Sequence, residues 1–144
     1  MSFSFVQHSP GIMLVGAYTC LGYGTFVADK PSWKLPAIMS VWFWGFSIYT
    51  MVQEGILAVI QNHNQNYWGN QVWFDLLYSV SLFWFALLPR AKAVGMPILP
   101  WFLYVASTAS IGGLHMYSRI LYLEEQEQEQ QEQEGNNDYQ GIKK

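Results

Sequence analysis

The segment MSVWFWGFSIYTMV (residues 39–52) does not contain a single charged side chain. A helix on the surface of a water-soluble bundle carries charged residues on its outer face, so this segment is typical of a helix in contact with lipid. The apolar run around it extends from about residue 36 to about residue 61. A transmembrane helix needs roughly 20 mostly apolar residues, so this run is long enough to cross a bilayer.

Three further runs have the same character, at about residues 11–28, 71–88 and 97–122. Of the 144 residues, 51% are hydrophobic, 17% are aromatic and only 12% are charged. Soluble domains carry about 25% charged residues. The sequence therefore predicts an all-α fold, a four-transmembrane-helix bundle formed by residues 1–123. Its helices are expected at about 11–28, 36–61, 71–88 and 97–122.

The last part of the chain, residues 124–144, has a different composition. It begins with EEQEQEQQEQEG (residues 124–135) and holds seven of the 10 acidic residues of the chain. Glutamate and glutamine offer no apolar face to bury, so we predict a disordered, solvated acidic tail. The alternative for its first turns is an extension of the last predicted helix. The first 123 residues carry a charge of +2 and the tail carries −5, which sums to the net charge of −3.

Several classes of function lack their sequence signals. Cys20 is the only cysteine, so no internal disulfide and no cysteine-based zinc site is expected. The few basic residues are scattered and form no patch for nucleic acid. Neither a phosphate-binding loop nor a nucleophile or metalloprotease motif is present, and we expect no metal and no cofactor. The expected partners are membrane lipids, a lipophilic small molecule, and a membrane protein or a second copy of the chain.

The basic residues of the connecting segments predict an orientation. Lys30 and Lys34 lie between the first and second runs, and Arg90 and Lys92 lie between the third and fourth. Positively charged loops face the cytoplasm or its equivalent. Both termini and the loop NHNQNYWGN (residues 62–70) are therefore expected on the opposite face. The N-terminal segment MSFSFVQHSP has no basic residue, so we interpret the first run as a retained span.

Two acids inside apolar runs predict a functional site. With a helical rise of 1.5 Å per residue, Glu54 and His115 are expected ~10 Å below the face opposite the basic loops, and Asp75 ~6 Å below it. Arg119 is expected nearer that face. A charge inside a membrane costs about 2.5–3.5 kcal/mol on insertion scales, so such residues indicate function. These four side chains are expected to converge on one polar pocket.

The chemistry expected of this pocket is acid catalysis. A carboxyl group removed from water holds its proton more tightly and can serve as a general acid near neutral pH. We interpret Glu54, Asp75 and His115 as candidate catalytic residues. Candidate substrate-binding residues lie on the polar faces of the four runs: Tyr18, Ser47, Thr50, Tyr78, Tyr104, Thr108 and Arg119. The alternative is a structural ion pair of Arg119 with Asp75 or Glu54, with His115 as a hydrogen-bond partner.

The segment from Phe74 to Glu125 resembles a family of small four-helix membrane proteins that is known only as a domain of unknown function. The resemblance is carried by these residues: Asp75 to Leu77, Leu82 to Trp84, Arg90, Gly95, Met96, Leu114, Tyr117 and Arg119. The family usually has a proline near the position of His115, which this chain lacks. The resemblance implies a fold and a topology, and it implies no activity.

The layout is also similar to two groups of proteins that handle isoprenoids, the neoxanthin-synthase-type membrane proteins and the integral-membrane terpene cyclases. This resemblance implies proton-driven rearrangement of a lipophile, with Glu54 and Asp75 in the analogous places. Three functions stay open at this stage. They are binding or isomerisation (or cyclisation) of an isoprenoid-like lipophile, a non-catalytic subunit or assembly factor of a membrane complex, and a proton or small-solute carrier.

Overall fold

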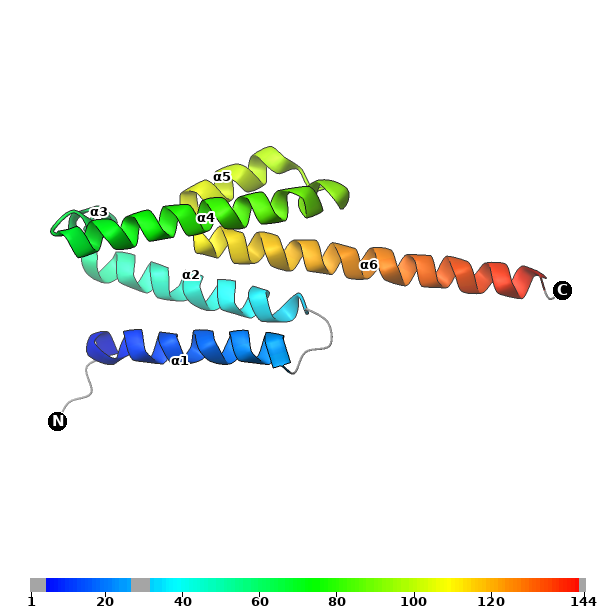
Figure 1. The fold of residues 1–144 in the computed structure, drawn as a ribbon, viewed down its shortest axis with the longest axis horizontal. Helices are drawn as coiled ribbons and strands as arrows, with labels where there is room; N and C mark the ends of the chain where they lie inside the picture. Colours follow the sequence, from blue (N-terminus) through cyan, green and yellow to red (C-terminus); the bar gives the residue numbers. More distant parts are fainter. Residues whose placement is uncertain (1–4, 27–31, 143–144) are drawn as a thin grey trace. The chain divides into compact units, whose positions relative to one another are not determined.

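The computed structural model describes residues 5–26 and 32–142 (Figure 1). These residues form six α-helices and no strand, which confirms the predicted all-α class. The chain divides into two compact units, Met1–Pro31 and Ser32–Lys144. The first unit contains α1 (Phe5–Phe26) and the second contains the other five helices.

Helix α1 covers most of the predicted span at residues 11–28, whose last two residues lie outside the described part of the chain. Its apolar side chains, such as Ile12, Leu14 and Val15, are exposed. The hydroxyl of Thr19 donates to the carbonyl of Val15 at 2.8 Å, which satisfies this polar group within the helix itself. Within its own unit, α1 therefore presents a largely apolar surface without a core.

The predicted helix at residues 36–61 is broken in the structure. Helix α2 spans Lys34–Glu54, and the short helix α3 spans Ala58–His63. Gly55 lies between them with φ 85°, a backbone conformation that favours glycine, and its N–H donates to the carbonyl of Met51. Because α2 ends here, Glu54 is the last residue of its helix.

Helix α4 (Tyr67–Ala93) is longer than the predicted 71–88 at both ends. The side chain of Asn66 accepts a hydrogen bond from the N–H of Gly69 at 2.8 Å, so the helix starts at an N-cap ahead of the apolar run. Pro89 lies inside the helix, which ends at Ala93, and the chain turns at Gly95, where φ is 69°.

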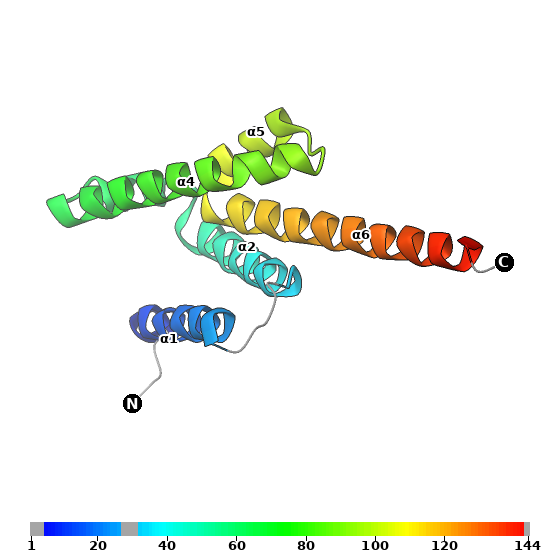
Figure 2. The ribbon, with the colours of Figure 1, turned by 45° about the vertical axis from the view of Figure 1, so that its right-hand side comes forward.

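The prediction of one helix over residues 97–122 is wrong. The chain forms α5 (Ile98–Thr108) and α6 (Ser110–Ile142), which are joined by Ala109 with φ 51° and ψ −119°. The two helices run in opposite directions along each other, as both views of the ribbon show (Figures 1 and 2). We call α5 together with residues 110–124 of α6 the C-terminal hairpin.

The buried core lies where this hairpin meets α4. It consists of Leu87, Ala91, Met96, Val105, Met116 and Ile120, of which Met116 and Ile120 are fully buried. Helix α6 contributes the centre of this core and also contacts α2 and α5. The hairpin therefore organises the packing of the second unit.

The reversal at Ala109 changes where the C-terminal part of the chain lies. We call the end of the second unit where α2 begins and α4 finishes the basic end, since it carries Lys34, Arg90 and Lys92. Residue Glu124 of α6 pairs with Arg90 at this end. The predicted placement of the C-terminal tail opposite the basic loops is therefore wrong, because that prediction assumed one straight helix.

The predicted disorder of the acidic tail is also not observed. Helix α6 continues to Ile142, and residues 125–136 are exposed throughout. Glutamate and glutamine are good helix formers, and the packed first part of α6 supplies the helical turns that are costly to nucleate. We call residues 125–142 the arm.

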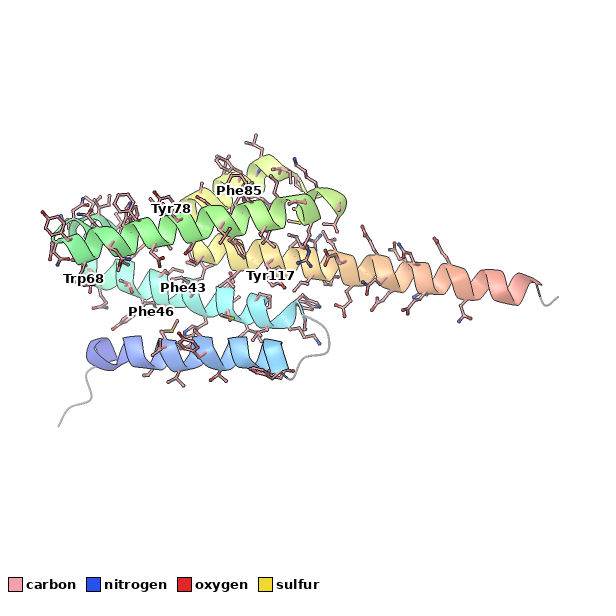
Figure 3. All side chains as sticks on the ribbon, viewed as in Figure 1. Phe43, Phe46, Trp68, Tyr78, Phe85 and Tyr117 are labelled. Atoms are coloured by element: carbon pink, nitrogen blue, oxygen red, sulfur yellow. The ribbon has the colours of Figure 1, made fainter. Side chains whose placement is uncertain are left out.

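Two helices, α2 and α4, are long and apolar enough to cross a membrane, and their most apolar windows are only 11% and 6% buried. The core helix of a soluble protein would be mostly buried, so this exposure fits helices that contact lipid or another apolar surface. Tyr78 and Phe85 extend outward from α4, and each is 71% exposed (Figure 3). The predicted four-span bundle is not established, because α5 has only 11 residues.

Candidate functional site

The C-terminal hairpin depends on close approach of its two helices. A Cβ atom built on Gly112 would lie 2.6 Å from the Thr108 hydroxyl oxygen and 2.9 Å from the Val105 Cα. A Cβ atom on Gly113 would lie 2.5 Å from the ring of Phe83 on α4. Small residues are what permit such contacts between helices in membranes. Gly112 thus fits α6 against α5, and Gly113 fits it against α4.

Two side chains of α2 bind the hairpin. The hydroxyl of Ser40, which is buried, donates to the carbonyl of Ile111 at 3.0 Å. The indole Nε1–H of Trp44 donates to the hydroxyl oxygen of Tyr104 at 2.8 Å. Ser40 and Trp44 lie four residues apart and hence on one face of α2. This face of α2 therefore binds the hairpin at two points, at Ile111 next to the reversal and at Tyr104 on α5.

Tyr104 connects this contact to His115 on α6. The Tyr104 hydroxyl oxygen lies 3.5 Å from the His115 Nδ1, and the two rings meet edge-on with centroids 5.8 Å apart. The ring of Trp101 also meets His115 at right angles, at 5.5 Å. His115 is exposed although two aromatic rings border it. We call Trp44, Trp101, Tyr104 and His115 the aromatic–histidine cluster.

The hydrogen-bond chemistry of the cluster has a direction. An indole N–H can only donate, so the Tyr104 oxygen accepts from Trp44. In the tautomer in which the His115 Nδ1 accepts the Tyr104 hydroxyl proton, the neutral imidazole carries its own proton at Nε2. That Nε2–H has no partner among the described residues. In the other tautomer, the His115 Nδ1–H donates to the second lone pair of the Tyr104 oxygen.

A second polar group lies at the basic end. Arg90 holds both carboxylate oxygens of Glu124, with its Nε at 2.9 Å from Oε1 and its Nη2 at 2.6 Å from Oε2. The same guanidinium lies over the ring of Tyr117, 5.5 Å from its centroid. This bidentate pair fixes the root of the arm to the end of α4.

Further contacts at the basic end join α6 to the start of α2. The Ser118 hydroxyl donates to the carbonyl of Trp33 at 2.8 Å, and the rings of Trp33 and Tyr122 meet edge-on at 5.4 Å. Arg119 lies over the Tyr122 ring at 5.4 Å. Arg119 therefore lies near the basic end, and not near the opposite face where the sequence predicted it.

The predicted pocket of acids is not assembled by direct contact. Among the described residues, no hydrogen bond or ion pair joins Glu54, Asp75, His115 and Arg119 to one another. Glu54 lies at the exposed end of α2, and Asp75 is exposed on α4. The predicted depth of Glu54 fails because it assumed that the helix continued to residue 61. The catalytic roles of Glu54 and Asp75 stay predictions.

The predicted substrate-binding residues fall into different places. Tyr104 and Thr108 lie in the hairpin, where the Thr108 hydroxyl donates to the Tyr104 carbonyl at 2.7 Å. Thr50 bonds to the carbonyl of Phe46 within α2. Tyr78 is exposed and stacks on Phe74. Ser47 is half-buried on α2, Tyr18 is exposed on α1 in the first unit, and Arg119 lies near the basic end as described above.

The sequence prediction found half of the aromatic–histidine cluster. It named Tyr104 and His115, but it placed them on one face of a single helix, whereas the structure brings them together across the reversal. It gave Trp101 and Trp44 no role in the site. The spacing of Ser40 and Trp44 on one face of a predicted span was the available signal for Trp44.

No protein-family model, curated protein or solved structure matches the chain. The resemblance of residues 74–125 to the four-helix membrane family therefore stays a prediction. What the chain does is inferred below from the geometry of its own side chains.

Proposed function

We propose that this chain is an integral membrane protein that binds a carbonyl-bearing lipophile at the aromatic–histidine cluster. The proposal takes α2 and α4 as membrane spans, supported by their length, their apolar composition and their exposed apolar faces. The C-terminal hairpin then enters from the basic end and returns to it. The positive-inside rule supports a cytoplasmic or equivalent location for the basic end and for the arm.

Depth supports contact of His115 with lipid. Nine residues of helix separate it from Glu124, the polar anchor at the basic end. At 1.5 Å per residue, this places His115 ~13 Å from that anchor. The hydrocarbon core of a bilayer is about 30 Å thick, so the exposed imidazole lies close to its middle. Water is scarce at this depth, and an N–H donor there gains from any acceptor.

The single observation that carries the proposal is the hydrogen bond from Trp44 to Tyr104. Because the indole can only donate, the Tyr104 hydroxyl proton stays available for His115. The proposal takes the tautomer in which the His115 Nδ1 accepts this proton and Nε2 carries an outward N–H. The matching ligand group is an acceptor without a proton of its own, such as the carbonyl oxygen of a ketone, a quinone or a lipid ester. The rings of Trp101 and Tyr104 offer apolar surface beside it.

The proposed role is binding, without a catalytic step. The acids that the sequence nominated for proton transfer, Glu54 and Asp75, make no described contact with the cluster. A general acid must come within hydrogen-bond reach of the group that it protonates. Binding needs only the donor and the apolar surface that the cluster provides.

The test is to purify the full chain from its membrane and identify the retained lipids by mass spectrometry. We expect a specific carbonyl-bearing lipophile with the wild-type protein and with His63→Phe, a matched control because His63 lies outside the cluster on α3. We expect its loss in His115→Phe. A wild-type protein that retains no specific lipophile, or a His115→Phe variant that retains it equally, would contradict the proposal.

A second experiment distinguishes the sources of the carbonyl group. The protein is reconstituted in vesicles of diether phosphatidylcholine, which has no ester carbonyl, and a long-chain ketone with a ¹³C-labelled carbonyl is added. Magnetisation transfer from that carbon to the ¹⁵N-labelled Nε2 of His115 reports binding. If diester phosphatidylcholine displaces the ketone, the ligand is the lipid ester, and if it does not, the ligand is a free ketone or quinone.

A second candidate function, a non-catalytic subunit or assembly factor, is supported by the arm. Its described side chains, residues 125–136, are all exposed, while its root is held by the Arg90–Glu124 pair. A rigid charged helix that leaves the core suits contact with another protein. Deletion of residues 126–144 is expected to weaken recovery of a defined membrane-protein partner, and unchanged recovery would argue against this role of the arm.

A further inference from the structure

We propose that the exposed face of α4 around Asp75 docks a transmembrane helix of another protein that carries a lysine or arginine at the same depth. The proposal does not depend on the lipophile site. It extends the second candidate function by naming the chemistry of the partner and the surface that it meets.

Asp75 is an exposed acid on an apolar helix. Its neighbours on the same face include Trp68, Tyr78 and Leu82, which are 78%, 71% and 74% exposed. No hydrogen bond or ion pair joins Asp75 to another residue in the described part of the chain. The face therefore combines a large apolar surface with one carboxylate that lacks a partner.

The depth of Asp75 makes that carboxylate costly in a lipid environment. Fifteen residues of α4 separate it from Arg90, whose pair with Glu124 marks the basic end. This spacing corresponds to ~22 Å of helix. In a hydrocarbon core of about 30 Å, Asp75 lies roughly 8 Å inside the opposite boundary. Its short side chain reaches less far toward water than lysine or arginine, which extend to the interface by their long stems.

A cation supplied from a neighbouring helix would remove most of this cost. Acids and bases inside membranes pair with one another or line aqueous paths. Lysine and arginine have the length to reach Asp75 from an adjacent helix. The small side chains of Ser79 and Ala86, on the same face and also exposed, leave room for close approach of a partner backbone.

The partner is not expected to be a second copy of this chain. Its described basic residues Lys34, Arg90, Lys92 and Arg119 all lie at or near the basic end. A copy in the same orientation would bring none of them to the depth of Asp75. No described basic residue of a second copy would supply the missing charge, so the proposal assigns it to a different protein.

The probe is a synthetic leucine–alanine transmembrane helix with one lysine placed at the depth of Asp75. Two control peptides replace the lysine with norleucine or move it to the basic end. The full chain carries a fluorescent donor at an introduced Gln130→Cys on the arm, in a Cys20→Ser background, and each peptide carries an acceptor. Association in vesicles is measured by energy transfer.

We expect the matched lysine peptide to associate about 5- to 30-fold more tightly than either control peptide, as for polar contacts between membrane helices. Asp75→Asn should remove this preference, and Glu127→Gln on the arm should keep it. Because no hydrogen bond or ion pair holds Asp75 in the described part of the chain, the Asp75→Asn variant should unfold at the wild-type temperature, which controls for misfolding.

Equal binding of the three peptides, or a preference that survives Asp75→Asn, would overturn the proposal. So would energy transfer between donor- and acceptor-labelled copies of the chain that Asp75→Asn reduces, since the occupant would then be a second copy.

Discussion

The indole nitrogen of Trp44 and the hydroxyl oxygen of Tyr104 lie 2.8 Å apart, although 60 residues separate them in the sequence. This hydrogen bond joins α2 to the C-terminal hairpin at about the level of His115. It links the packing of the second unit to the proposed binding site. A change that weakens it should therefore reduce both stability and ligand binding.

Replacing Trp44 or Tyr104 with phenylalanine removes one partner of this bond. Each substitution is expected to lower the free energy of unfolding by about 0.5–1.5 kcal/mol, the usual range for one hydrogen bond. The double variant should lose less than the sum of the two, because both single variants remove the same interaction. Unfolding in mixed micelles gives the free energy of unfolding of the wild type, the two single variants and the double variant. Additive losses would show that the two side chains do not interact.

Gly112→Ala is expected to destabilise the protein by about 1–3 kcal/mol, the range for overpacked contacts. The added Cβ would meet the backbone of Val105 and Tyr104 at 2.9 and 3.0 Å, and neither atom can move as a flexible side chain can. Gly45→Ala on α2 is the matched control, because nothing lies within 4 Å of its added Cβ. The control should be neutral or stabilise by up to about 1 kcal/mol, given the helix propensity of alanine. A Gly112→Ala variant as stable as the control would contradict the close packing of α5 on α6.

The Arg90–Glu124 pair is expected to contribute little to the free energy of unfolding, but to restrict the motion of the root of the arm. Its side chains are 38% and 30% exposed, and partly exposed pairs contribute roughly 0.2–1 kcal/mol. Glu124→Gln should therefore leave the unfolding temperature nearly unchanged. It should increase the mobility of a spin label at Gln126→Cys in a Cys20→Ser background, because the root of the arm loses its bidentate anchor. Glu134→Gln, farther along the arm, serves as the control. If the label is equally mobile in all three proteins, the pair does not anchor the arm.

Labelling by a membrane-impermeant thiol reagent tests the topology. Single cysteines are introduced as Lys92→Cys, Gln130→Cys and Gln65→Cys in a Cys20→Ser background. Positions 92 and 130 should react from the same side of sealed vesicles, since α6 returns to the basic end, and position 65 should react from the other side. Reaction of positions 65 and 130 from one side would restore the topology with a single straight C-terminal span and contradict the hairpin.

The apolar patterns of the sequence were sufficient for the all-α class and for the two long helices α2 and α4. Apolar runs of this length with so few charges leave few other options. The end of α2 could have been predicted as well, because Gly55 directly follows Glu54 and glycine commonly terminates helices. With that boundary, Glu54 would have been placed at the helix end rather than inside the span.

The reversal at Ala109 has only a weak local signal in the sequence. The Ser, Thr and Gly-Gly residues of STASIGG (residues 107–113) lower helix propensity, but alanine itself favours helix and disfavours the positive φ that it adopts. The reversal is selected by tertiary packing, through Gly112 against α5 and Ser40 against the carbonyl of Ile111. Tyr104 and His115 were chosen for their polarity, but only the reversal brings them together.

The prediction that the acidic tail is disordered failed for a related reason. Its composition of glutamate and glutamine indicates the absence of a core, which the structure supports, since residues 125–136 are exposed. The same residues have high helix propensity, and a helix already formed by residues 110–124 extends at little cost. The low hydrophobicity of the arm correctly predicted that its side chains are exposed. It incorrectly predicted that the backbone is disordered.

The tautomer of His115 is the most direct test of the central claim that the cluster directs an N–H outward into the membrane. Solid-state NMR of the full chain in lipid bilayers, with ¹⁵N-labelled histidine, distinguishes the three histidines by comparison with His115→Phe. The account predicts a neutral imidazole protonated at Nε2, with Nδ1 shifted by a hydrogen bond that Tyr104→Phe removes. A neutral ring protonated at Nδ1, or spectra that Tyr104→Phe leaves unchanged, would contradict it.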